Sequence, residues 1–173
     1  MSFYRSIDKF ISICKHNYAI IADTISYRNK KVNHIDYFTD NIPIYISTRL
    51  VKWYTKIDNS IPVGIAIYNK QGNPVILINE ACEHYVHKAT LLRHELGHIK
   101  RGHFGSFKNL PKEEREFQAD VYAANTIGVN KVLSWLSDYK VKLSDYPETR
   151  KLIEGRIRRL ITCYGVEFLQ KKE

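Results

Sequence analysis

The spacing of apolar positions changes along the chain and predicts one helix, then short strands, then further helices. Apolar side chains recur every three or four residues over residues 3–18, which indicates an amphipathic helix. Three runs of strand length follow at Asn41–Thr48, Val63–Tyr68 and Pro74–Asn79. The last two runs are separated by Asn-Lys-Gln-Gly-Asn, which is typical of a hairpin connection. We therefore expect about three strands after the first helix.

From residue 85 onward the pattern is helical. We expect helices over residues 85–101 and 109–127, a third from Asn130 and a fourth from Pro147. Gly102 and Gly128 mark the ends of the first two. The second begins with Asn-Leu-Pro-Lys-Glu-Glu, in which the asparagine can cap, the proline suits the first turn and the acids favour the positive end of the helix dipole. Strands followed by a run of helices predict an α+β fold.

The first of these helices contains Leu-Leu-Arg-His-Glu-Leu-Gly-His-Ile-Lys, residues 91–100. His94 and His98 lie four residues apart, so both imidazoles lie on one helix face and can bind one zinc ion. Glu95 is about 100° further round the helix, where it can reach a metal-bound water as a general base. Leucines cover much of the helix, so these polar groups are expected to be buried and to need partners. Gly97 suggests that another segment approaches closely.

The next helix carries candidates for the remaining positions of a zinc site. Glu116 and Asp120 are again four residues apart and share a face. Alanines at 119, 123 and 124 leave this surface small enough for a second helix to come close. Glu116 can be the third ligand, and Asp120 can accept a hydrogen bond from a ligand histidine and fix its tautomer.

Other histidines near the motif are also candidate ligands. His103 follows soon after His98, but the spacing of the metzincin motif requires a glycine at 101 and a histidine at 104, where Arg101 and Phe104 stand. His103 lacks the metzincin spacing, but it is the alternative to Glu116 as third ligand. His87 is about 10 Å from His94 along a helix, too far to share the ion. No Cys-x-x-Cys pair is present, which excludes a cysteine-based zinc ribbon.

The motif His-Glu-Leu-Gly-His, followed by Glu-x-x-Ala-Asp on the next helix, resembles the gluzincin metallopeptidases. More narrowly, it is similar to soluble minigluzincins and to the catalytic domains of the CAAX-processing and heat-shock membrane proteases, with ImmA/IrrE-type peptidases as cousins. The resemblance implies that His94, His98 and Glu116 bind one Zn²⁺ per chain. It also implies that Glu95 is the catalytic base and that Asp120 is the partner of His94.

The resemblance implies a zincin-like fold, in which a small twisted sheet packs on the motif helix and on C-terminal helices. The Pro74–Asn79 strand would be its substrate-aligning edge strand. A late segment of such proteins is matched by Tyr146-Pro147 and by the sequence from Arg156 to Leu160, with tyrosine in place of histidine and a longer spacer. Candidates for contacts with the transition state or the substrate are Arg156, Tyr146 and Tyr122. The predicted edge-strand contacts are Val75, Ile76, Leu77, Ile78 and Asn79.

The resemblance also sets the expected domain organisation. Residues 61–173 are expected to form the metallopeptidase domain, and residues 1–60 an unassigned extension containing a helix and a strand. The two parts are expected to form one compact unit, because no interdomain linker is evident. No apolar run is long enough to span a membrane, and the first residues lack a signal peptide, so we expect a cytoplasmic protein.

Charge raises a second class of function. The net charge is +9 and is spread along the chain, with one close basic cluster between Arg150 and Arg159. This cluster could contact an acidic partner such as nucleic acid, although a solvated helix face explains it as well. The sequence therefore predicts a zinc-dependent endopeptidase that acts on a peptide or protein. The alternative is a zincin-fold regulatory or nucleic-acid-associated binding module with restrained or vestigial proteolysis.

Overall fold

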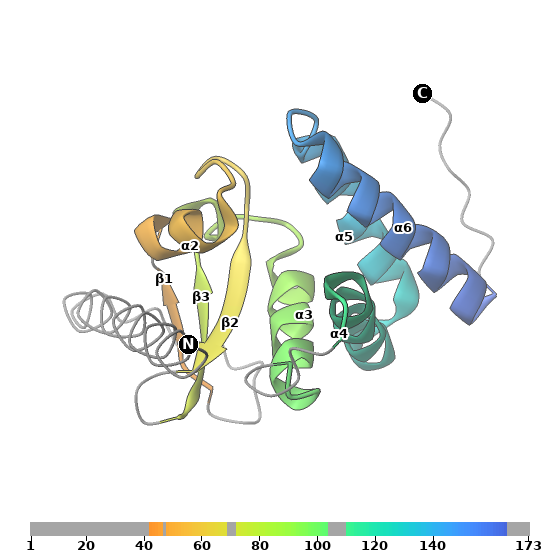
Figure 1. Cartoon of the computed structure of the whole chain (residues 1–173), viewed down its shortest axis with the longest axis horizontal. Coiled ribbons are helices and arrows are strands. Elements are labelled where there is room, and N and C mark those ends of the chain that lie inside the picture. Colours follow the sequence, from red (N-terminus) through yellow and green to blue (C-terminus); the bar gives the residue numbers. More distant parts are fainter. Residues whose placement is uncertain (1–41, 47, 69–71, 104–109, 166–173) are drawn as a thin grey trace, which may run out of the picture. The chain divides into compact units, whose positions relative to one another are not determined.

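The computed structural model describes residues 42–46, 48–68, 72–103 and 110–165 (Figure 1). The chain divides into two compact units, residues 1–83 and residues 84–173. The first contains a three-stranded mixed sheet and the second contains four long helices, so the predicted α+β class is confirmed. The helix expected at residues 3–18 lies outside the described residues. The domain boundary expected at residue 61 stays a prediction.

The sheet is built from β1 (Ile44–Ile46), β2 (Gly64–Tyr68) and β3 (Pro74–Ile78). β2 and β3 pair antiparallel, in agreement with the predicted hairpin. β1 is shorter than the predicted run, because a helix that the sequence pattern did not indicate, α2 (Thr48–Thr55), begins two residues after it.

The prediction that Val75, Ile76, Leu77, Ile78 and Asn79 form an edge strand is wrong. The strand order is β1-β3-β2, so β3 is the middle strand of the described sheet. The physical reason is that β1, from the segment with no recognisable motif, pairs in parallel with the far side of β3. The backbone groups that would bind a peptide are therefore already paired within the sheet.

Asn79 has a structural place at the end of β3. Its buried side chain accepts a hydrogen bond from the backbone N–H of Val63 (3.0 Å) and donates one to the carbonyl of Ile61 (2.6 Å). These bonds satisfy backbone groups of the segment that enters β2. Asn79 thus fixes the start of the hairpin from inside the unit.

The second unit contains α3 (Lys88–Lys100), α4 (Lys112–Ile127), α5 (Val129–Lys142) and α6 (Pro147–Tyr164). Their order and approximate bounds agree with the hydrophobic periodicity. Gly128 has φ 95°, a value that favours glycine, where the chain leaves α4 and enters α5 at once. The position of Asn109 as a cap lies outside the described residues, and Pro111 stands at the N-cap instead. No helix in the described ranges is long and apolar enough to cross a membrane.

The helices of this unit pack around a shared apolar core. α3 lies against α4, and α5 packs on both α4 and α6 (Figure 1). The fully buried side chains come from every one of these helices: Leu92, Leu96, Ala119, Ala123, Leu133, Trp135, Leu136, Ile153 and Leu160. Burial of this apolar surface holds the helices in one arrangement.

Gly97 permits the closest approach in this unit. A Cβ atom at residue 97 would lie 2.8 Å from the carbonyl oxygen and 2.9 Å from the Cα of Ala119. Backbone atoms cannot move aside as a flexible side chain can, so the two helices could not keep their spacing. The close approach expected from the glycine and the alanines is therefore present between α3 and α4.

We predict that Gly97→Ala destabilises the chain by about 1–3 kcal/mol, the usual effect of overpacking. The matched control is Gly155→Ala on α6, where an added Cβ meets no atom within 4 Å. In that open helical position alanine should be neutral or stabilising, by up to about 1 kcal/mol. Urea unfolding of both variants measures the difference. Equal effects on stability would contradict the close approach.

Candidate metal centre

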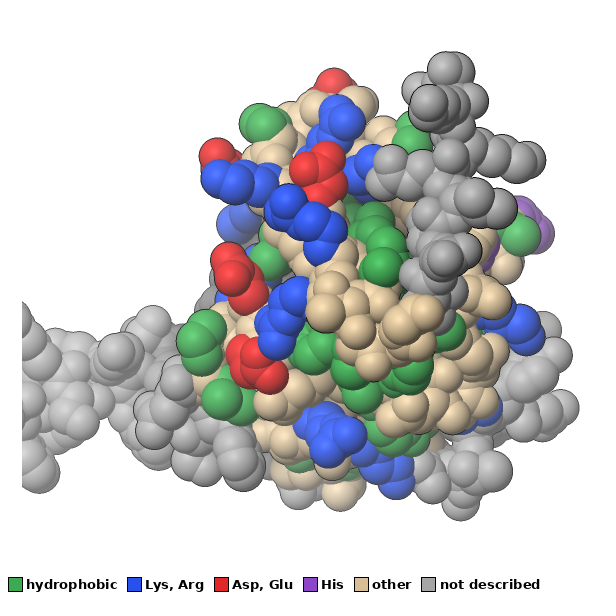
Figure 2. Space-filling model, turned by 90° about the vertical axis from the view of Figure 1, so that its right-hand side faces the viewer, with side chains coloured by type: hydrophobic (Ala, Val, Ile, Leu, Met, Phe, Trp, Pro, Cys, Tyr) green, Lys and Arg blue, Asp and Glu red, His purple; other side chains and the backbone are tan. Residues whose placement is uncertain are grey.

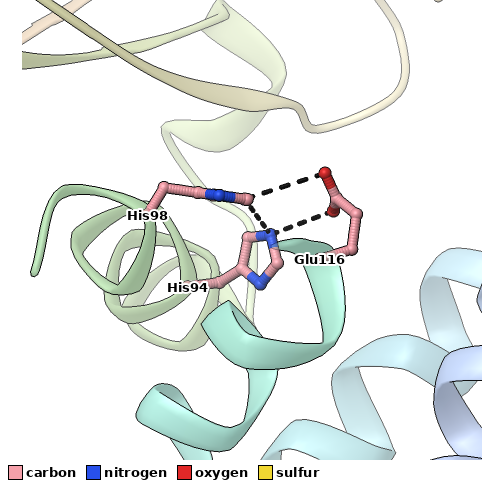
Figure 3. Close-up of side chains that lie close together, drawn as sticks. All are labelled: His94, His98 and Glu116. Carbon is pink, nitrogen blue, oxygen red and sulfur yellow. Dashed lines mark hydrogen bonds and ion pairs between the residues drawn. The ribbon is translucent and has the colours of Figure 1, made fainter. Parts of the chain in front are cut away.

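Three side chains from α3 and α4 converge in the second unit: His94, His98 and Glu116. Helical spacing places both histidines on the α3 face that looks toward α4, and the contact at Gly97 brings Glu116 opposite them. Figure 3 shows the three side chains turned toward one another. The Nε2 atoms of the histidines are 3.1 Å apart. The Glu116 carboxylate oxygens lie 3.3 Å from Nε2 of His94 and 3.7 Å from Nε2 of His98.

This arrangement fits a tetrahedral metal site. Ligands at 2.0–2.1 Å from a zinc ion lie about 3.3 Å from one another in tetrahedral geometry. The observed separations are close to this value: 3.1 Å between the two Nε2 atoms, 3.3 Å from His94 to Oε2 of Glu116 and 3.7 Å from His98 to Oε1 of Glu116. Each residue of the group offers one ligand atom, and His94, His98 and Glu116 together could hold a metal ion. Two neutral imidazoles and one carboxylate suit a borderline divalent ion.

Asp120 lies directly behind His94. The Nδ1 atom of His94 donates a hydrogen bond to the Asp120 carboxylate (2.8 Å), which leaves Nε2 directed at Glu116 and His98. Asp120 is fully buried. A carboxylate in this position fixes the tautomer of the imidazole and makes it a stronger ligand. The contact is the one expected from the sequence for Asp120.

Arg156 joins the two carboxylates of this group. Its Nε and Nη2 atoms donate to the two oxygens of Asp120 (2.7 and 2.6 Å), and its Nη1 atom lies 3.2 Å from Glu116. The guanidinium is buried, with its centre 5.6 Å from the ring of Trp135. The same indole ring lies 5.2 Å from the ring of His94. The sequence suggests Arg156 as a contact for a substrate or transition state. In the structure it contacts the candidate ligand Glu116 and Asp120, the partner of His94.

Burial and mutual charge set the protonation of the group. Burial alone lowers the pKa of His94, but hydrogen bonds to Asp120 and Glu116 outweigh it and raise the pKa to about 9. Burial and the positive charge of His94 lower the pKa of His98 to about 3. Burial raises the pKa of Glu116, but its hydrogen bond with His94 and the charge of Arg156 hold that pKa well below its usual range.

The charges of four of these groups are therefore balanced at neutral pH. Glu116 and Asp120 are negative, while Arg156 and protonated His94 are positive. A buried group of this size is tolerated because every charge has a close partner. A divalent ion bound at Nε2 of His94 must displace the proton held there, so metal uptake and proton release are coupled.

His103 is not a member of the metal-binding group, although it was a rival third ligand. Its Nδ1 atom lies 2.9 Å from Nδ1 of His98, on the side of that ring away from Nε2. Its Nε2 atom lies 3.0 Å from Oε1 of Gln118. Two sets of contacts are not indicated by the sequence: that of His103 with Gln118, and those of Trp135 with His94 and Arg156. They join residues whose separation along the chain carries no helical periodicity, so no pattern could have indicated them.

The other predicted residues occupy defined places, and their roles stay predictions. Glu95 follows His94 on α3 and is buried, with 5% of its surface exposed. Tyr122 lies on α4 at the close contact, where its Cβ would be 3.2 Å from a Cβ at residue 97. Tyr146 stands at the N-terminus of α6, and its backbone N–H donates to the carbonyl of Leu143.

The basic cluster on α6 is largely paired with acids. Arg156 binds the buried carboxylates, Arg150 lies 3.5 Å from Glu154, and Arg159 lies 2.7 Å from Glu114. Figure 2 shows Lys and Arg side chains interspersed with Asp and Glu side chains over the pictured face. Three basic side chains of the cluster thus contact acids within this unit, and an acidic or nucleic-acid partner for the cluster stays a prediction.

Comparison of the chain with protein-family models, with curated proteins and with solved structures gives no significant match. The case for a metal centre therefore rests on the geometry of His94, His98 and Glu116 and on the groups that surround them.

We predict that zinc affinity rises about tenfold per pH unit until the pH reaches about 9, the pKa of His94, and then levels off. The sign follows because the bound proton competes with the ion below that pH. Chelator competition at several pH values, corrected for the protonation of the chelator, measures the slope. Asp120→Asn is the control, since an amide accepts the same hydrogen bond without the charge that raises the pKa. Levelling of the wild-type affinity near pH 6.5 would contradict the coupling.

We predict that Arg156→Met destabilises the chain by about 3–5 kcal/mol, because it leaves the buried carboxylate of Asp120 without its counter-charge. Arg150→Met is the matched control on the same helix. Its ion pair with Glu154 is exposed, so its loss should cost about 1 kcal/mol or less. Thermal and urea unfolding measure both. A loss for Arg156→Met no larger than that for Arg150→Met would show that the buried pair is not needed.

Proposed function

We propose that the chain is a zinc-dependent endopeptidase of the gluzincin type. His94, His98 and Glu116 hold the ion, and Glu95 is the general base. One observation carries the proposal: Nε2 atoms of two histidines and a carboxylate face one another at the separations of a tetrahedral site. The motif supports the same reading, because a glutamate directly after the first histidine has no use in a purely structural metal site.

The ligand set supports a catalytic rather than a structural ion. Structural zinc sites in proteins use four protein ligands, whereas catalytic sites use three and leave one position for water or substrate. The metal-binding group found among the described residues has three members. When bound, zinc supplies a Lewis acid that polarises a carbonyl group and lowers the pKa of a bound water.

The chain's own residues account for the proton transfers in this proposal. Glu95 takes a proton from the attacking water as the oxygen–carbon bond forms. It then gives that proton to the nitrogen of the amine that leaves when the carbon–nitrogen bond breaks, so the carboxylate is regenerated. Asp120 and Arg156 stay behind the ligands and hold their orientation. The ion-paired basic helix favours this enzyme over the nucleic-acid-associated binding module.

We predict about one zinc per chain in the wild type and in Glu95→Gln, and none in Glu116→Ala. Hydrolysis of an unfolded protein such as casein should occur in the wild type, stop with chelator and return with zinc. Glu95→Gln should lower turnover by about 10²–10⁴-fold, because an amide cannot accept the proton. Metal analysis and a peptide-release assay provide the measurements.

Glu113→Gln is the control for charge loss, since Glu113 is an exposed acid in the first turn of α4. It should keep both zinc and turnover. Unchanged turnover in Glu95→Gln would remove this residue from the mechanism, and full zinc content in Glu116→Ala would refute the ligand set. Zinc binding without hydrolysis of any peptide would favour the binding module.

A further inference from the structure

The second ligand histidine is held by a chain of polar side chains that runs from the metal-binding group to the surface. Nδ1 of His98 meets Nδ1 of His103 (2.9 Å), and Nε2 of His103 meets Oε1 of Gln118 (3.0 Å). Gln118 donates from its amide nitrogen to Glu114 (3.1 Å), whose other oxygen accepts from Arg159 (2.7 Å). His103 is buried, whereas the side chains of Arg159 and Glu114 are 44% and 34% exposed.

The chemistry of the outer members fixes the direction of each hydrogen bond from Arg159 to His103, and a neutral His103 fixes the last one, to His98. A guanidinium can only donate, and an ionised carboxylate can only accept. Glu114 must therefore face the amide nitrogen of Gln118, which turns the amide oxygen toward His103. That oxygen only accepts, so His103 carries a proton on Nε2, and in its neutral form it presents a bare Nδ1 to His98. His98 must then carry its proton on Nδ1, which leaves the lone pair of its Nε2 directed at the metal-binding group.

We propose that His103, Gln118 and Glu114 form a tautomer relay that keeps His98 in the neutral form whose Nε2 binds the metal. His103 and Gln118 are positioning residues in this proposal, and Arg159 anchors the outer end. The inference rests on the proposed metal centre, because it concerns how one ligand is oriented. It assigns to His103 the role for His98 that the carboxylate of Asp120 has for His94.

The anchor has a second contact that holds it in place. The guanidinium carbon of Arg159 lies 3.8 Å from the centre of the Phe117 ring, so α6 is tied to α4 through both a charge and an aromatic face. A pair that is half-exposed adds little to stability by itself. Its effect here is to choose which end of the Gln118 amide faces inward.

Exchange of the two outer relay residues provides a direct test. In Glu114→Gln, Arg159 and Gln118 compete for one amide oxygen, and a flipped Gln118 would reverse the tautomer of His103. In Gln118→Glu, two carboxylates meet. The double variant, Glu114→Gln with Gln118→Glu, restores a complete set: the new amide donates to the new carboxylate, which accepts from His103. We expect Glu114→Gln to lose zinc affinity, by up to the 10–100-fold typical of outer-shell partners. Gln118→Glu alone keeps an acceptor for Nε2–H of His103 and should lose less affinity. The double variant should regain most of what Glu114→Gln loses.

The control removes another polar link between the same two helices. The hydroxyl of Tyr164 donates to the amide oxygen of Asn125 (2.6 Å), and this pair takes no part in the relay. Asn125→Ala should leave zinc affinity unchanged. Chelator competition gives the affinities, and urea unfolding of each full-length variant shows that lost affinity is not lost fold.

Nitrogen-15 NMR of the imidazoles reads the tautomers directly, with and without zinc. We expect His103 to be neutral with its proton on Nε2 in the wild type and in the double variant, and a mixture of tautomers in Glu114→Gln. A wild-type His103 protonated on Nδ1, or a Glu114→Gln variant that binds zinc as tightly as Asn125→Ala, would overturn the relay while leaving the metal centre intact. A wild type that binds no zinc but keeps His103 protonated on Nε2 would instead overturn the metal centre.

Discussion

The close approach of α3 and α4 at Gly97 is the constraint on which the candidate site depends. The imidazoles and the carboxylate reach one another only because the backbone of Ala119 lies where a side chain at 97 would otherwise stand. Once the helices are this close, Glu116 can contact both His94 and His98, because the two histidines are one turn apart on the same face of α3. The absence of a Cβ atom at Gly97 therefore lets the two helices come close enough for the three polar side chains to converge.

Convergence of so many charges inside a protein needs compensation, and Arg156 supplies most of it. The guanidinium binds both oxygens of the buried Asp120 and also reaches the partly exposed Glu116, so one cation serves two anions. His94 carries the remaining positive charge, with Nδ1–H directed at Asp120 and Nε2–H directed at Glu116. The proton on Nε2 of His94 occupies the position that a metal ion would take. The partners of His94 can therefore stay in place whether Nε2 holds a proton or an ion. The arrangement is preorganised for a cation, which is what a catalytic metal site requires.

Much of this second unit could be predicted from the sequence, because it depends on local periodicity. The i, i+4 spacing of His94 and His98, and of Glu116 and Asp120, specifies faces of helices without knowledge of the fold. The sheet was harder. The resemblance implies that β3 is an edge strand, and nothing in the sequence of β1 indicates which strand it joins. Parallel pairing with β1 makes β3 the middle strand. The helix that follows β1 was also missed, because its short sequence carries no distinctive start or stop signal.

The part of the site that sequence reasoning could not reach is the environment of the second ligand histidine. Its partners His103 and Gln118 come together only through tertiary packing.

The two ligand histidines have opposite electrostatic surroundings. His94 has carboxylates on both nitrogens and a pKa raised to about 9, while His98 has the imidazole of His103 on its Nδ1 and a pKa lowered to about 3 by burial and the charge of His94. A metal ion entering at neutral pH therefore meets one ligand that must lose a proton and one that is already deprotonated. Metal uptake then releases one proton from this pair rather than two, and that proton comes from the histidine that Asp120 and Arg156 hold in place.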